Sequence, residues 1–261
     1  MNIRKKILTR CGALLTAVLV LAPTALAAEA EIPYIPQTVP AAQLAPADQR
    51  GQEDWQLLLV NPWHTVPEGY EIKLATLSNG LQVDERIYDD LDDMLSDCRE
   101  AGLNPIVCSA YRTEATQTRL YRNKVARVRA SGVPEDRVEA EAARWVAKPG
   151  TSEHQTGLAL DIVAAGYQIL DEEQEDTAEQ KWLMENSWKY GFILRYPSEK
   201  SDITGIGYEP WHYRYVGKAA AADIYRTGVC LEAELAPAQT IRQAAPASGS
   251  METAPQGAAA I

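Results

Sequence analysis

Ten residues, 152–161, restrict the fold more than any other stretch of the chain. They contain His154, one of only three histidines in the protein, and an aspartate seven positions later. Large apolar residues alternate with smaller ones over 158–163, which predicts a β-strand that carries Asp161. Glycine permits backbone turns that other residues disfavour, so Gly157 predicts a turn that brings His154 back toward Asp161.

A second polar stretch contains Glu209 and His212. A hydrolytic zinc site needs three protein ligands and an open position for water, and His154, Asp161 and His212 supply a common set of donors for it. Glu209 is the candidate general base, because a base must stand beside the water without being a ligand. Pro210 pushes the preceding residue to extended geometry, which predicts a loop-to-strand junction here rather than a helix.

The remaining pattern mixes strands and helices without a βαβ rhythm, which predicts the α+β class. Thr113 is the predicted N-cap of one of the helices. A short apolar run, 56–60, is predicted as a strand or a buried segment. The predicted helices cover 88–100, 114–130, 134–148, 177–190 and 218–225, and the other predicted strands cover 105–108, 192–196 and 212–216.

These motifs resemble those of a known family. The stretch 152–161 resembles the S-x-H-x-x-G-x-A-x-D motif of VanY-type D-alanyl-D-alanine carboxypeptidases, and 209–212 resembles their E-x-W-H motif. Residues 109–112 resemble the S-x-Y-R segment of that family, and the similarity extends from about Leu57 to Leu231. Each motif taken singly also suits a structural role, and it is their joint occurrence that favours an enzyme.

The resemblance implies a small antiparallel sheet flanked by helices, in the zinc fold that D,D-peptidases share with the Hedgehog signalling domain. It implies Zn2+ as the cofactor, with His154, Asp161 and His212 as its ligands and Glu209 as the catalytic base. It also implies that Arg112 contacts the substrate and the developing oxyanion. A guanidinium suits that role because it offers a planar fork of donors.

Some side chains have a second interpretation. Arg112 also suits a surface ion pair. Ser152 is a candidate for substrate binding, and a purely local turn role is equally consistent with its position. His64 lies outside both zinc motifs, and since nothing spaces it as a ligand we assign it to a loop or packing role.

The implied activity is removal of the terminal D-alanine from peptidoglycan stem peptides. The ligand residues do not decide specificity, so an L,D-carboxypeptidase, a dipeptidase or an endopeptidase on the same scaffold stays open. The loops 164–180 and 198–208 would make that choice. Two further classes are a non-catalytic cell-wall-binding module and a metal-stabilised adhesion domain. The presence of Glu209 argues against the binding module, which has no use for a base.

The N-terminal sequence predicts that the protein is exported. Four basic residues precede an apolar run that ends in small residues, which is the pattern of a signal peptide over 1–27. An uncleaved membrane anchor is the alternative and would be the chain's contact with a membrane. Residues 28–52 are predicted as an Ala/Pro-rich linker, 53–235 as the catalytic domain and 236–261 as a disordered Ala/Pro-rich tail. We expect a secreted or cell-envelope protein.

The charge of the chain limits its partners. Without residues 1–27, the chain has 21 Lys and Arg against 36 Asp and Glu, a net charge of −15. This argues against nucleic acid as a partner, because phosphate binding needs a basic face. No apolar patch is evident in the sequence, so a monomer is expected.

Three cysteines remain after that segment, namely Cys98, Cys108 and Cys230. Cys98 falls near the end of a predicted helix and Cys108 in the strand that follows, which would allow the two to lie side by side. Spacing does not decide connectivity, so a Cys98–Cys108 disulfide and free thiols are both open. Cys230 is then a free or buried thiol.

Overall fold

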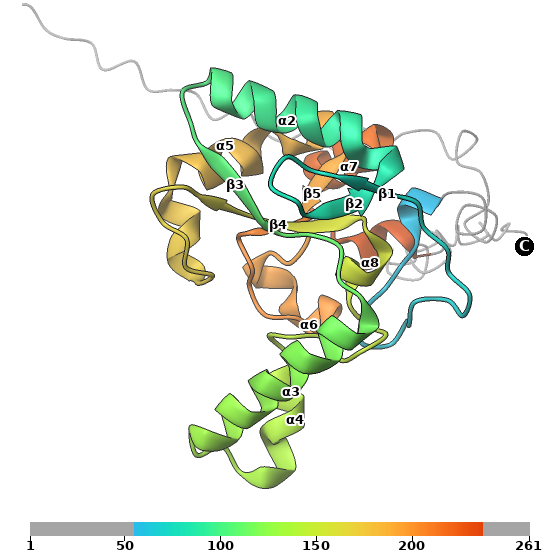
Figure 1. Ribbon diagram of the computed structural model, residues 1–261, viewed down its shortest axis with the longest axis vertical. Helices are drawn as coiled ribbons and strands as arrows, with labels where there is room; N and C mark the ends of the chain where they lie inside the picture. Colours follow the sequence, from blue (N-terminus) through green and yellow to red (C-terminus); the bar gives the residue numbers. More distant parts are fainter. Residues whose placement is uncertain (1–54, 237–261) are drawn as a thin grey trace, which may run out of the picture. The chain divides into compact units, whose positions relative to one another are not determined.

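The computed structural model describes residues 55–236, and its centre is a four-stranded antiparallel sheet in the order β3-β4-β6-β5 (Figure 1). The sheet contains β3 (Pro105–Ser109), β4 (Ala159–Ala164), β5 (Phe192–Leu194) and β6 (His212–Tyr215). A separate hairpin contains β1 (Leu74–Thr76) and β2 (Gln82–Asp84). The helices are α2 (Tyr88–Glu100), α3 (Glu114–Ala130), α4 (Glu135–Ala143), α5 (Ala178–Asn186), α6 (Ser201–Thr204), α7 (Lys218–Thr227) and α8 (Leu231–Leu235).

This arrangement confirms the α+β class and the small antiparallel sheet flanked by helices. The predicted signal peptide, linker and most of the tail lie outside the described residues. Within residues 55–236, no helix combines the length and the apolar character that crossing a bilayer requires.

The two faces of the sheet have different chemistry. Successive residues of a strand point to opposite faces, so Leu160 and Ile162 on β4 share one face, and Asp161 points to the other. The first face packs in the main hydrophobic core with side chains of α2 and α5, including Leu91 and Leu183. The second face is also buried, since all six residues of β4 are buried. Polar side chains on this second face are therefore enclosed in the protein.

Strand register brings two of the predicted ligands together. In the β4–β6 pair, Asp161 lies directly opposite His212. Residues directly opposite on antiparallel strands project to the same face with Cβ atoms about 5 Å apart. A register shift between Val107 and Ser109 on β3 places Ser109 opposite Asp161 on the other side. Such a bulge re-aims the following side chains, here toward the polar face.

Three of the five predicted helices are confirmed, and two end early. The helix predicted over 177–190 ends as an α-helix at Asn186, and a 3-10 helix, Ser187–Tyr190, follows it. The Thr113 hydroxyl accepts a hydrogen bond from the Thr116 N–H (3.2 Å) and caps α3, as predicted. The helix predicted over 134–148 is wrong in its last third, because α4 ends at Ala143. The chain leaves the helix there, and the Ala147 carbonyl accepts a hydrogen bond from the buried Gln117 side chain (2.7 Å). This tertiary contact gives the Ala147 carbonyl a hydrogen-bond partner outside the helix.

The disulfide alternative is wrong, since Cys98, Cys108 and Cys230 are all free thiols. Cys98 is buried on the inner side of α2, whereas Cys108 lies at the β3 bulge and is exposed. The neighbouring Val107 takes the position that faces the core. The Cys108 thiol instead contacts the Asp161 carbonyl oxygen at 3.5 Å. The two sulfur atoms therefore lie on different sides of β3.

The predicted turn at Gly157 is confirmed and requires glycine. Its φ of +73° is left-handed, and an added Cβ would lie 2.9 Å from the Asp84 amide nitrogen and closer still to the Ile72 side chain. Gly132 has a similar φ of +87°, but no heavy atom lies within 4 Å of the position that its Cβ would take. The two glycines share the conformational requirement and differ in the space around them.

Gly157→Ala should therefore destabilise the protein more than Gly132→Ala. The left-handed backbone alone should cost roughly 1 kcal/mol at Gly132. The clash at Gly157 should add roughly 1–3 kcal/mol, because overpacking a closed site forces neighbours to shift. Denaturant unfolding of both variants measures the difference. Equal losses of stability would show that Asp84 and Ile72 can move away from the added methyl group at no energetic cost.

Candidate active site

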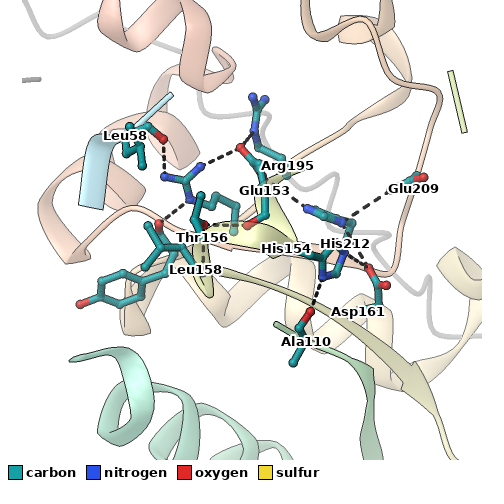
Figure 2. A network of polar contacts seen from close by, with 12 residues as sticks. Leu58, Ala110, Glu153, His154, Thr156, Leu158, Asp161, Arg195, Glu209 and His212 are labelled. Carbon is teal, nitrogen blue, oxygen red and sulfur yellow. Dashed lines mark hydrogen bonds and ion pairs between the residues drawn. The ribbon is translucent and has the colours of Figure 1, made fainter. Parts of the chain in front are cut away.

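His154 is held from one side of its ring. It lies in a 3-10 helix, Glu153–Thr156, that Gly157 ends just before β4. The His154 Nδ1 atom is 2.8 Å from the Ala110 carbonyl oxygen (Figure 2). A carbonyl only accepts, so Nδ1 carries the proton and donates it. The other nitrogen, Nε2, then faces Asp161 with a free lone pair, 3.4 Å from its Oδ1.

His212 is oriented with its other ring nitrogen, Nδ1, toward Asp161. Its Nδ1 lies 3.2 Å from Asp161 Oδ1, and its Nε2 lies 3.4 Å from Glu153 Oε2. The two imidazole rings meet edge to face with centroids 4.9 Å apart. The Tyr196 ring packs on His212 with centroids 4.7 Å apart. Both rings therefore direct one nitrogen toward Asp161.

These three side chains fit a zinc ion. Their candidate donor atoms lie within 4.8 Å of one another, and all three residues are buried. Two ligand atoms at about 2.0 Å from a tetrahedral zinc are roughly 3.3 Å apart. The distances of 3.4 Å and 3.2 Å from Asp161 Oδ1 to His154 Nε2 and His212 Nδ1 match that spacing. The structure thus brings the predicted ligands His154, Asp161 and His212 into one site.

Glu209 stands beside this triad. It lies in the loop before β6, at the predicted loop-to-strand junction, and its Oε2 is 3.6 Å from His212 Nδ1. Burial raises the pKa of Glu209 to about 8, although the neighbouring His212 acts in the opposite direction. A carboxyl group in that range both accepts and returns a proton near neutral pH. The positive charge of a bound metal ion would lower this pKa again.

Arg112 reaches the triad from the loop after β3. It donates from Nη2 to Asp161 Oδ2 (2.7 Å) and from Nε to Ser109 Oγ (2.9 Å). Its backbone N–H donates to the His154 carbonyl oxygen (3.1 Å). The ion pair of Arg112 is therefore made inside the site and not on the outer surface. Its contact with a substrate remains a prediction.

The pKa values of the ligands reflect these contacts. Burial lowers the pKa of His154 to about 4, and the positive charge of Arg112 acts in the same direction. Burial also opposes charge on His212, but its hydrogen bonds with Asp161 and Glu153 prevail and raise its pKa to about 9. Because a metal must displace any proton on its ligand, binding at His212 is coupled to proton release.

A cavity of about 770 Å³ opens onto the triad. Its walls come from α3, the segment after α4, the loop before α5 and the loop before β6. Basic side chains on α3 lie in one wall and acidic side chains near 171–173 in another. The lining residues are Arg112, Leu120, Lys124, Arg127, Trp145, Val146, Ala147, His154, Asp161, Leu170, Asp171, Glu172, Glu173, Tyr196, Ile206, Glu209, Trp211 and His212.

Two predicted positions lie outside that cavity. Ser152 is buried just before the 3-10 helix, makes no side-chain capping hydrogen bond and does not line the cavity. Its role in substrate binding stays a prediction. His64 is exposed and hydrogen bonds with the Asn61 side chain, which confirms a loop position away from the triad.

Sequence reasoning did not identify a buried charged cluster behind the triad. Glu153 accepts hydrogen bonds from Arg195 Nε and Arg214 Nη1, each at 2.7 Å. Arg195 also pairs with Glu232 on α8, a helix that was not predicted. The available signal was an arginine within each of two otherwise apolar or aromatic strands, at 192–196 and 212–216. Buried arginines require acidic or carbonyl partners.

Substitution of a ligand should remove the metal. His212→Ala removes one of three donors, so stoichiometric zinc should be lost on dialysis against a weak chelator. His64→Ala is the matched control, because it also deletes an imidazole but lies in an exposed loop. Metal content by mass spectrometry checks both. Unchanged zinc in His212→Ala would contradict the ligand set.

Comparison with known proteins identifies the family. A family model described as VanY, D-alanyl-D-alanine carboxypeptidase, matches residues 80–218. A curated D-alanyl-D-alanine carboxypeptidase of Enterococcus faecalis is 47% identical over 190 residues, which cover 72% of this chain and 69% of that protein.

Two solved structures are similar to this chain. One is a mutant of the vancomycin resistance D,D-pentapeptidase VanY from a VanB-type cassette, in complex with Zn(II), with 47% identity and a TM-score of 0.64. It matches 70% of this chain and 99% of its own length. The other is VanYB in complex with D-alanine-D-alanine, with 47% identity, a TM-score of 0.65 and coverage of 69% and 97%. With a family match over more than half of its residues and these relatives, the chain belongs to the VanY family of D-alanyl-D-alanine carboxypeptidases.

Proposed function

We propose that this protein is a zinc-dependent D-alanyl-D-alanine carboxypeptidase that removes the terminal D-alanine from peptidoglycan stem peptides. One observation carries the proposal. The register of β4 and β6 places Asp161 against His212, with His154 and the carboxylate of Glu209 beside them at the edge of a cavity. The E. faecalis relative and the zinc-containing structure support the reaction class and the metal.

His154, Asp161 and His212 hold the zinc ion, and each has one donor atom directed toward the others. When bound, zinc polarises a carbonyl oxygen and lowers the pKa of water from about 16 to near 7. Glu209 is near this centre without being one of the three donors. Its carboxylate accepts the proton of the attacking water and returns it to the leaving amine.

Arg112 provides positive charge at the same edge. Its guanidinium lines the cavity, and its contacts with Asp161 and Ser109 hold it in one orientation. Guanidinium donors suit a carboxylate or a developing oxyanion, and a fixed donor needs no reorganisation during the reaction. Arg112 thus serves both the substrate and the oxyanion in this proposal.

The specificity of the reaction depends on the cavity walls. Leu170 to Glu173 and Ile206 belong to the two loops that sequence analysis singled out, and they line the cavity. The triad is compatible with D,D, L,D, dipeptidase or endopeptidase specificity. A structure of a relative with D-alanine-D-alanine supports the D,D reaction for this chain. The presence of Glu209 at the triad also favours an enzyme over a binding or adhesion module.

The same proposal includes the location of the protein. A basic, apolar and small-residue pattern in residues 1–27 supports export to the cell envelope or the medium, where stem peptides are found. The net negative charge after that segment supports the exclusion of nucleic acid as a partner. We propose a monomer whose membrane contact, if residues 1–27 are retained, is limited to that segment.

A substrate digest tests the function directly. Purified muropeptides with pentapeptide stems should lose the mass of one alanine, and addition of a chelator should abolish this loss until zinc is restored. Tetrapeptide stems and cross-linked dimers are the matched substrates for L,D-carboxypeptidase and endopeptidase activity. Mass spectrometry distinguishes the three products. Cleavage of only the tetrapeptide or the cross-link would overturn the proposed specificity.

Glu209→Gln should separate metal binding from catalysis. The amide keeps the shape of the side chain but cannot accept a proton, so the turnover number should fall by about 10²–10⁴-fold. Zinc content should remain at the wild-type level because Glu209 is not among the three donors. Kinetics with pentapeptide substrate and metal analysis of the same sample check this. Wild-type turnover would exclude Glu209 as the base.

A further inference from the structure

Glu153 lies directly behind the metal site and is not one of its ligands. Its side chain is completely buried, and Figure 2 shows it between Arg195 and His212. One carboxylate oxygen, Oε1, accepts from Arg195 and Arg214, each at 2.7 Å. The other oxygen, Oε2, is 3.4 Å from His212 Nε2. Each oxygen of this carboxylate therefore has a different partner.

The two arginines are themselves held in place. Arg195 donates to both carboxylate oxygens of Glu232, at 2.7 Å and 3.0 Å. Arg214 donates to the carbonyl oxygens of Gln56 (3.0 Å) and Leu58 (2.7 Å). With both donors fixed, rotation of the Glu153 carboxylate would break two charge-assisted hydrogen bonds. Its Oε2 is thus kept toward His212.

We infer that Glu153 is a positioning residue, which holds a proton on His212 Nε2 and thereby directs His212 Nδ1 to the metal. A carboxylate only accepts, so each imidazole nitrogen that faces one is a proton donor in the metal-free site. A metal ion held by Asp161 and His212 would replace the proton on Nδ1, whereas Glu153, which is not a ligand, keeps the proton on Nε2. The remaining nitrogen, Nδ1, faces Asp161. Histidine ligands commonly donate their second N–H to a carboxylate or a carbonyl, which fixes the tautomer and orients the ring.

The two histidines of the site are fixed in complementary ways. The Ala110 carbonyl accepts from His154 Nδ1 and leaves Nε2 for the metal. Glu153 accepts from His212 Nε2 and leaves Nδ1. This inference rests on the proposed zinc site, and it adds a specific dependence of that site on a buried residue outside the ligand set.

Glu153→Gln tests the inference. Two arginine donors require the amide oxygen, so the amide N–H would face His212 Nε2 and favour the wrong tautomer. Zinc affinity, measured by competition with a chromophoric chelator, should fall about 10–100-fold. Glu232→Gln is the matched control, because it perturbs Arg195 without contacting His212, and Arg214 still holds Glu153 Oε1. It should keep the wild-type zinc affinity.

Nitrogen NMR of the zinc-loaded protein supplies a second readout, which loss of packing alone would not produce. The chain has only three histidines, and His64 lies outside the site, so the imidazole signals are assignable with single variants. Wild-type protein and Glu232→Gln should show a proton on His212 Nε2. Thermal unfolding of each variant verifies that it is folded.

The outcomes separate the inference from the proposed function. If the wild-type protein binds no zinc, both fail. If it binds zinc with the proton on His212 Nδ1, the inference fails and the function stands. Wild-type zinc affinity in Glu153→Gln, or an equal loss in Glu232→Gln, would also overturn the inference. If Glu153→Gln does not fold, a wild-type spectrum with the proton on His212 Nδ1 would still overturn the inference.

Discussion

The antiparallel pairing of β4 with β6 is the constraint on which the site depends. It places Asp161 opposite His212 on a buried face of the sheet, at the edge of the cavity. The opposite face carries apolar side chains that pack against α2 and α5. A slip by one residue would exchange the two faces, because side chains alternate with a period of two. The register that builds the hydrophobic core is therefore also the register that builds the metal site.

The buried charged side chains behind the metal site need partners of opposite charge. The fold brings these partners together from distant parts of the sequence. Glu153 is paired with Arg195 and Arg214, and Arg195 with Glu232 on α8. Breaking one such buried pair leaves an uncompensated charge and costs about 3–5 kcal/mol, whereas the intact pair contributes little net stability. The cluster therefore adds little net stability of its own. It connects the C-terminal helix to a metal ligand through two shared side chains.

The metal site and the cavity walls are built by different parts of this molecule. The triad and Glu209 are placed by the sheet and by the segments beside it, which are held by hydrogen bonds such as that of His154 with Ala110. The cavity walls come from α3, whose charged side chains there are basic, and from loops whose side chains near 171–173 are acidic. A rigid scaffold with variable walls allows one hydrolytic centre to serve several peptide specificities. Family membership thus specifies the chemistry more firmly than the substrate.

The sequence by itself determined the local features: the strand and turn around His154 and Asp161, the helix cap at Thr113 and the three candidate metal ligands. These follow from short-range rules or from motifs that retain their spacing. Only the tertiary structure decided that α4 ends at Ala143, that Cys98 and Cys108 lie apart, and that Glu153 supports His212. The physical reason is that each of these outcomes depends on contacts between distant segments. Periodicity and local spacing carry no information about such contacts.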